Sequence, residues 1–307
     1  MSQTNTIGDT IFRAILLLAA ASILLIVTAI IVMMTQNSLP SIRQYGFSFL
    51  TSSEWNPSAG LYGALPFIYG TVVSSVIAVI ISVPLSLGIA IFLTEQASVR
   101  FGRPIAFLVE LLAAIPSVVY GLWGIFVLAP FVREYLGAFL QNYLGFIPLF
   151  QGRLTGIGML TGALILAIMI TPIITAVVRD VLEAVPTTQR EAALALGATE
   201  WETTRVVLSN AASGIAGAVV LGLGRAIGET MAVTMVIGNV PQITASLFEP
   251  GYTIASVLAA NFAEARDALY FSALIEIGLI LFLVTFVVNA LAKLLVIGVT
   301  SGAGQKA

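Results

Sequence analysis

The chain has 307 residues, of which 59% are apolar and 9% are charged, and its formal net charge is −2. Soluble domains carry about 25% charged residues, so a water-soluble globule of this length could not cover its surface. The composition therefore excludes a cytosolic enzyme and a disordered chain. The net charge is too small to indicate nucleic-acid binding.

The chain contains neither Cys nor His. Disulfides, thiolate nucleophiles, cysteine or imidazole metal sites and Ser-His-Asp catalysis are excluded for this reason. The two lysines, Lys293 and Lys306, do not stand in a glycine-rich P-loop, so this chain does not bind ATP in that way. We expect no metal and no cofactor in this chain.

Long stretches without charge predict helices that cross a membrane. No charged residue lies between Arg13 and Arg43, or between Glu54 and Glu95. A bilayer core of about 30 Å needs roughly 20 apolar helical residues, and consecutive apolar residues do not alternate as a β-barrel requires. The sequence predicts an all-α membrane protein, a single domain over 1–307. Its six predicted spans are 11–34, 64–94, 104–130, 155–178, 211–238 and 269–298.

Lysine and arginine set the predicted orientation, because they gather on the cytoplasmic side. With both termini cytoplasmic, the inner side holds Arg13, Arg100, Arg103, Arg179, Arg190, Arg205, Lys293 and Lys306. The outer side then holds Arg43, Arg133, Arg153 and Arg266, and Arg225 lies within a span. Pro84 and Pro116 are expected to kink or open their helices. The outer segment 131–154 is expected to lie along the membrane interface as an amphipathic helix.

The segment 179–210 connects the fourth and fifth predicted spans on the cytoplasmic side. Thr188 with Glu191, and Thr199 with Glu202, have the spacing of capping boxes, so each pair predicts a helix start. Gly197 predicts a left-handed end of the first helix. Ala193 and Gly197 are four residues apart on one face of this helix and permit close approach by a partner, and Glu191 presents a carboxylate beside that face. The alternative is a packing elbow between two spans.

The fifth predicted span contains two charges, Arg225 and Glu229. Residues four apart share one face of a helix, and a charge in mid-membrane costs several kcal/mol. Either the two side chains neutralise each other and hold the bundle together, or Arg225 offers its planar guanidinium to an oxyanion in transit. Glu110 and Glu276 are candidates to extend this polar path. The alternative is that both are carboxylates near helix ends.

Glu191-Ala192-Ala193, followed by Gly197, resembles the EAA loop of ABC importer permeases. In that family the loop is a coupling helix that docks on an ATPase subunit, which implies this role for Glu191, Ala192, Ala193 and Gly197. The family pattern ends in a proline that is missing after Leu208. The resemblance implies the type I ABC importer (MetI-like) permease fold.

Longer strings sharpen the resemblance. Residues 222–232 (GLGRAIGETMA), 114–124 (AIPSVVYGLWG) and the Trp55-Asn56-Pro57 run with Gly46-Phe47-Ser48-Phe49-Leu50 are similar to permeases of phosphate-specific ABC importers, PstC type. In that family the Arg and Glu of the fifth span are implicated in phosphate passage, which implies this role for Arg225 and Glu229.

The resemblance also implies partners and a location. They are a second permease subunit (PstA type), two copies of an ATP-binding subunit (PstB type) that hold ATP and magnesium, and a phosphate-binding protein (PstS type). The location is the bacterial cytoplasmic membrane. Two other functions remain open: a permease for another oxyanion such as sulfate or molybdate, and a membrane scaffold or sensor that docks a soluble partner. An intramembrane hydrolase is set aside, because Asp9, Asp180 and Asp267 all fall outside the spans.

Overall fold

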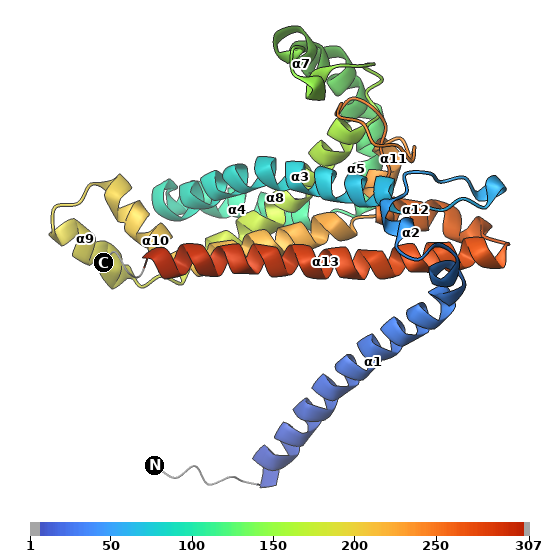
Figure 1. Cartoon of the computed structure of the whole chain (residues 1–307). Coiled ribbons are helices and arrows are strands. Elements are labelled where there is room, and N and C mark those ends of the chain that lie inside the picture. The colour runs from blue at the N-terminus through green and yellow to red at the C-terminus, as the bar shows by residue number, and fades with distance from the viewer. Residues whose placement is uncertain (1–6, 304–307) are drawn as a thin grey trace.

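The computed structural model describes residues 7–303, and it is built of helices (Figure 1). Lys306, which the predicted charge distribution placed inside, is outside the described residues. Four long helices run side by side: α3 (Leu65–Ile91), α8 (Met159–Glu183), α10 (Glu200–Gly228) and α13 (Ala268–Ala303). We call the two ends of this bundle the α9 end and the α12 end, after the short helices α9 (Thr187–Ala195) and α12 (Ile254–Asn261) that lie there.

Helix α8 lies at the centre of the bundle, and most of its residues are buried. It packs against α3, which turns four buried serines, Ser74, Ser75, Ser82 and Ser86, into the bundle. Small side chains let two helix backbones approach closely, which is how helices associate where no water drives them together. The Ser86 hydroxyl also donates a hydrogen bond of 3.0 Å to the carbonyl of Thr171 in α8.

Six helices in the described residues are long and apolar enough to cross a membrane, which confirms the predicted number. They are Ile11–Tyr45, Leu65–Gln96, Ser117–Leu144, Met159–Glu183, Glu200–Gly228 and Ala268–Leu294. The second, fourth and sixth agree with the predicted spans within a turn or two, and the first begins where predicted but continues to Tyr45. The third and fifth differ more.

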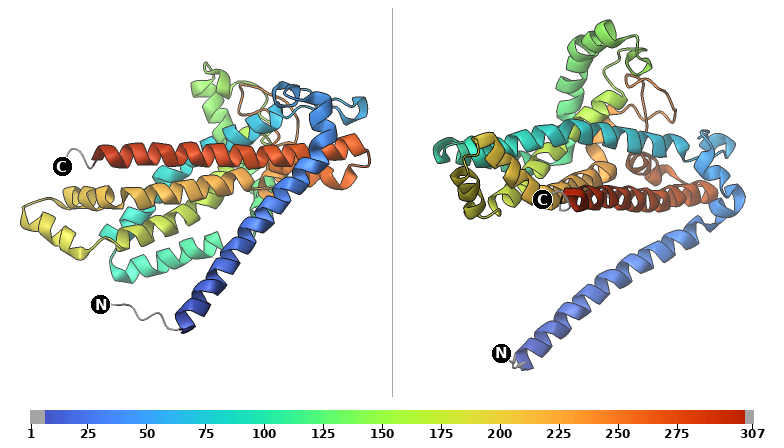
Figure 2. Two further views of the ribbon diagram at one scale, coloured as in Figure 1. Left: turned by 60° about the horizontal axis from the view of Figure 1, so that its bottom comes forward. Right: turned by 60° about the vertical axis from the view of Figure 1, so that its left-hand side comes forward.

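The predicted third span, 104–130, is wrong, because the chain bends in the middle of it. Helix α4 (Val99–Ala113) runs along α8 and ends just before Pro116, which begins a new helix. Proline lacks an N–H donor and disfavours a helical residue before it. The new helix runs across the bundle direction and projects from it (Figures 1 and 2). Its parts are α5 (Ser117–Trp123), η3 (Gly124–Leu128), α6 (Ala129–Phe131), η4 (Val132–Leu136) and α7 (Gly137–Leu144).

The predicted fifth span, 211–238, is also displaced. Helix α10 begins at Glu200, so the short second helix expected in the loop and the fifth span are one continuous helix. It ends at Gly228, and after Glu229 a separate short helix, α11 (Met231–Val236), follows. The charge pattern could not show this break, because it occurs inside a stretch that is apolar on both sides.

Helix α1 (Ile7–Tyr45) leans away from the bundle and joins it only at the α12 end, beside α13 (Figures 1 and 2). Aromatic side chains gather at this junction: Trp55 lies edge-on to Phe67 with ring centroids 4.9 Å apart, and Tyr62 stacks on Tyr270 at 5.6 Å. The remaining short elements are α2 (Ser48–Thr51), η1 (Pro57–Ala59), the π-helical η2 (Phe92–Gln96), η5 (Pro148–Phe150) and η6 (Phe262–Glu264).

Candidate functional site

The segment between α8 and α10 forms a helix, a glycine turn and a second helix start, as predicted, but its first helix starts differently. Helix α9 begins at Thr187 with Pro186 in the capping position, and no side chain caps it. The predicted capping box of Thr188 with Glu191 is therefore wrong. Pro186 takes the non-helical capping position two residues before Thr188, so Thr188 lies inside the helix and cannot be the cap.

The end of α9 and the start of α10 are as predicted. Gly197 has a φ of +85°, and the Ala198 N–H donates to the carbonyl of Ala193 at 3.1 Å, which closes the helix in the manner of a Schellman turn. Thr199 then caps α10: its N–H donates to the Glu202 carboxylate at 2.8 Å, and its side chain accepts from the Glu202 N–H. The second capping box is confirmed.

The loop presents an exposed surface at the α9 end. Glu191 and Ala192 are exposed and Ala193 is half-buried. Large apolar side chains lie among them: Leu196 is 90% exposed and Trp201 is 67% exposed. Large apolar side chains that gather on a surface outside a lipid-facing stretch mark a protein contact site. This arrangement can bind a partner at the end of the bundle.

Arg225 and Glu229 do not form the ion pair that a single helix would give them. Arg225 is in the last turn of α10, and Glu229 stands just beyond the end of the helix in an extended conformation. Its carboxylate instead accepts a hydrogen bond of 3.3 Å from the Ala232 N–H in the first turn of α11. No ion pair between the two residues occurs within residues 7–303. The assumption that both side chains share one helix face is therefore wrong.

The Arg225 side chain is exposed and lines a cavity of about 550 Å³ between three helices. The other walls are Ile173 of α8, Val220, Leu221 and Gly224 of α10, and Asn289 of α13. Apart from Arg225, Asn289 supplies the polar side chain. A guanidinium with no carboxylate partner in the described structure, in a cavity that a neutral amide also lines, can bind an oxyanion.

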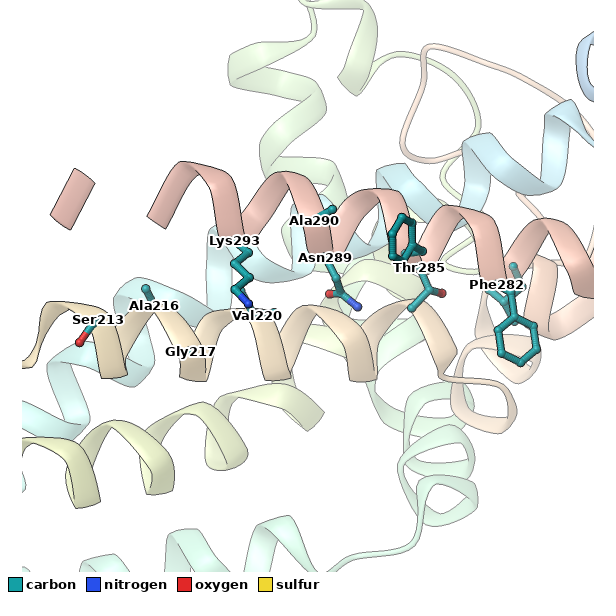
Figure 3. A pocket seen from close by; sticks show the side chains of 11 residues that line it. Ser213, Ala216, Gly217, Val220, Phe282, Thr285, Asn289, Ala290 and Lys293 are labelled. Carbon is teal, nitrogen blue, oxygen red and sulfur yellow. The ribbon is translucent and has the colours of Figure 1, made fainter. Parts of the chain in front are cut away.

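A second, larger groove of about 920 Å³ lies between α10 and α13 and shares Val220 and Asn289 with the first (Figure 3). Thr285, Asn289 and Lys293 line it at intervals of four residues, so one face of α13 carries its polar groups toward α10. Sequence reasoning missed Thr285 and Asn289. Their four-residue spacing with Lys293 in a largely apolar helix was the signal that could have found them.

Glu110 lies away from this cavity, in an ion pair. Its carboxylate is 3.0 Å from the guanidinium of Arg179 in α8, whose side chain is 18% exposed. Arg179 also contacts Asp180 at 3.1 Å and Glu183 at 3.7 Å. Glu110 thus joins α4 to the α9 end of α8, an arrangement that favours the alternative of a carboxylate near a helix end.

Glu276 lies on the side of α13 that faces α1. It is buried, one of its carboxylate oxygens has no hydrogen-bond partner, and it lines a cavity of about 300 Å³ with Ile42 of α1. Glu276 and Asn289 are thirteen positions apart, which corresponds to about 20 Å along a helix and to nearly opposite faces. The structure therefore does not bring Glu276 together with Arg225.

Two glycines of the sequence strings 114–124 and 222–232, Gly121 and Gly222, have packing roles. A Cβ atom on Gly222 would lie 2.5 Å from the Ile174 side chain of α8, and one on Gly121 would lie 2.5 Å from Met235 of α11. These contacts place α10 against α8 and α5 against α11. The glycines thereby fix the position of the helix end that carries Arg225.

The Trp55 string is part of a buried cluster at the α12 end. Phe49 is fully buried, and the Asn56 side chain caps the short helix η1. Burial and the nearby charge of Asp267 raise the pKa of Tyr62 to about 12, so its hydroxyl stays neutral in water of ordinary pH. This string holds the loop between α1 and α3 in place.

Comparison with known proteins identifies the family. Residues 82–300 match the family described as binding-protein-dependent transport system inner membrane component. The chain is 49% identical over 272 residues to the phosphate transport system permease protein PstC of Mesorhizobium japonicum, covering 87% of this chain and 83% of that protein. It is 48% identical to the PstC protein of Pasteurella multocida over 274 residues, covering 88% and 85%.

The fold is that of a solved ABC transporter. A chain of the inward-facing MetNI methionine ABC transporter aligns with a TM-score of 0.53 at 18% sequence identity, covering 78% of this chain and 98% of that one. The predicted MetI-like permease fold is thus confirmed. With the family match over 219 of 307 residues (82–300), the chain belongs to the binding-protein-dependent transport system inner membrane components, and it is a multi-pass membrane protein of the inner membrane.

Proposed function

We propose that this chain is a membrane-spanning permease subunit of an ATP-driven importer, and that the ion it conducts is inorganic phosphate. The observation that carries the proposal is the Arg225 cavity between α8, α10 and α13, which is lined by an exposed arginine and by Asn289. The names of the relatives that are 48–49% identical to this chain support phosphate over sulfate or molybdate.

Arg225 acts by offering a planar set of donors to the oxyanion, while the apolar walls of the cavity limit how much water competes for it. Glu229 lies beyond the end of α10, so it does not neutralise Arg225 directly; it fixes the first turn of α11. The anion then meets Asn289 and Lys293 in the adjoining groove.

In this proposal, partner subunits supply the energy for transport by hydrolysing ATP. The loop with Glu191, Ala192, Ala193 and Gly197 docks on one of two ATP-binding subunits (PstB type), which hold ATP and magnesium. A second permease subunit (PstA type) completes the path, and a phosphate-binding protein (PstS type) delivers phosphate at the α12 end. The α9 end is then cytoplasmic, and so are the two chain termini.

The test is phosphate uptake by proteoliposomes that contain the complete complex, with the binding protein outside and ATP inside. We expect Arg225→Gln to abolish uptake while the subunits still co-purify, because the amide keeps donors but loses the charge. Arg103→Gln, a change of an exposed arginine in α4, is the matched control and leaves uptake unchanged. Normal uptake by Arg225→Gln would refute the role of Arg225, and transport of sulfate in place of phosphate would refute the substrate.

A further inference from the structure

One arginine of α9 binds two other helices of the bundle. Arg190 lies in the first turn of α9, and its guanidinium donates to the carbonyls of Val185 at 2.7 Å and Leu182 at 3.0 Å, at the end of α8. The last carbonyls of a helix lack partners within the helix, and a cation near them is favourable. Arg190 thereby holds α9 against the end of α8.

The same guanidinium binds Glu95 through both carboxylate oxygens. The Nη2–Oε1 distance is 2.8 Å and the Nε–Oε2 distance is 3.2 Å. Glu95 belongs to η2, the π-helical turn that ends the long helix of α3. The Glu95 side chain is 10% exposed and that of Arg190 is 21% exposed, so water screens this pair less than it screens a surface pair.

The ion pair of Arg190 and Glu95 is the main polar contact between α9 and the bundle. Helix α9 has no buried residue, and among the ion pairs of residues 7–303 this is the one that joins α9 to another helix. A force on α9 therefore reaches α3 and α8 together through Arg190. These are the two helices that pack most closely at the centre of the bundle.

We propose that Arg190 and Glu95 are positioning residues that transmit the movement of α9 to α3 and α8, and so couple ATP hydrolysis to transport. The inference rests on the proposed function, because it requires α9 to contact the ATPase. The exposed surface of α9 makes that contact, and Arg190 carries its movement inward. Removing the pair should uncouple hydrolysis from transport without releasing the ATPase.

The first experiment uses the complete complex in proteoliposomes and measures both phosphate imported and ATP hydrolysed. We expect Arg190→Met and Glu95→Gln to lower phosphate imported per ATP by about tenfold, because each leaves the other group of a largely buried pair without its partner. Arg190→Lys should fall between, since lysine keeps the charge but not the two-pronged contact. Arg103→Met is the control and keeps the ratio of the unchanged protein. A merely structural role would lower both rates together and leave the ratio constant.

The second experiment replaces the ion pair by a covalent link. Because the chain contains no Cys, the introduced cysteines are the only thiols of this subunit that a reagent can modify. The double variant Glu95→Cys with Arg190→Cys should be uncoupled. A reversible bis-methanethiosulfonate reagent that joins the two thiols should restore the ratio, and a reductant should remove the effect again. The reagent should change nothing in the two single cysteine variants.

Three outcomes decide the matter. A normal ratio in Arg190→Met and Glu95→Gln would overturn the proposal, and so would a formed cross-link that leaves the double variant uncoupled. Loss of the ATPase from Arg190→Met would also overturn it, because the pair would then be needed for docking itself. If the unchanged complex imports no phosphate, the proposed function fails instead, so the two failures are distinguishable.

Discussion

At the scale of single residues, a variant of the buried Glu276 can separate a role in phosphate transport from a role in the stability of the complex. One of its oxygens has no hydrogen-bond partner, and it faces α1. A buried charge without a partner costs free energy, and glutamine keeps the shape of glutamate without the charge, so Glu276→Gln should raise the stability of the complex by about 1 kcal/mol. Thermal unfolding in detergent measures this, with the exposed Glu264→Gln as the control that changes nothing.

Phosphate uptake by Glu276→Gln should equal that of the unchanged protein, because the residue lies about 20 Å along α13 from Asn289. Loss of uptake in a variant that remains stable would return Glu276 to the polar path.

The sequence could identify Arg225 as a candidate site residue, because a charge within an apolar span is conspicuous. It could not show that Glu229 lies past a helix end, since this depends on how α10, α11 and α8 pack.

At the scale of elements, the turn after α9 gives a prediction about backbone conformation. A Cβ atom on Gly197 would meet no atom within 4 Å, so the constraint is its φ of +85° and not a lack of space. ATPase binding should therefore fall in the order Gly, Asn, Ala, Val at this position. Asn tolerates the left-handed region, Ala costs about 1–2 kcal/mol there, and β-branched residues are true outliers.

Co-purification of the ATPase with each Gly197 variant measures this order. The control is Gly88→Ala in α3, where a Cβ also meets no atom but the backbone is helical. The backbone explanation would be contradicted if Ala and Val at position 197 caused equal loss of ATPase binding while an Asn-sized polar side chain at Ala195 caused none. Local signals were partly reliable here: Gly197 and the pair of Thr199 and Glu202 were predicted correctly, whereas the pair of Thr188 and Glu191 was not, because Pro186 starts the helix earlier.

Breaks inside long helices were harder to foresee. Pro116 divides the predicted third span because the chain turns away there, whereas Pro84 and Pro172 lie inside continuous helices. The residue type is the same in all three cases. What differs is whether neighbouring helices hold the two halves in line, and that contact information is not present in the local sequence.

At the scale of the whole molecule, the orientation of the chain is a prediction that labelling can test. Leu196 is 90% exposed at the α9 end, and Phe47 is 89% exposed at the α12 end. In intact cells, a membrane-impermeant thiol reagent should label Phe47→Cys and should label Leu196→Cys only after the membrane is opened. Labelling of Leu196→Cys in intact cells would reverse the predicted topology.

The number of membrane helices followed from charge alone, because an unpaired charge in lipid is costly whatever the fold. The arrangement of those helices did not. Helix α1 leans out of the bundle and the helix from Ser117 to Leu144 runs across it. Both directions are set by contacts between residues far apart in the chain, which composition and periodicity do not record.

The two ends of the bundle are held together by different forces, and this makes them respond to different conditions. Stacked rings such as Tyr62 and Tyr270 hold the α12 end, while Arg179 and Arg190 bind carboxylates at the α9 end. Dissolved salt screens the interaction between charges with a Debye length of about 8 Å at physiological ionic strength and about 3 Å at 1 M. Aromatic packing does not depend on charge and stays intact. Salt on the side of the α9 end, which is cytoplasmic in the proposed topology, should therefore weaken the half-exposed contact of Arg179 with Glu110 first, and the largely buried pair of Arg190 and Glu95 less. Ion pairs thus stabilise one end of the bundle and aromatic packing stabilises the other, and in the proposed topology the two ends face different compartments.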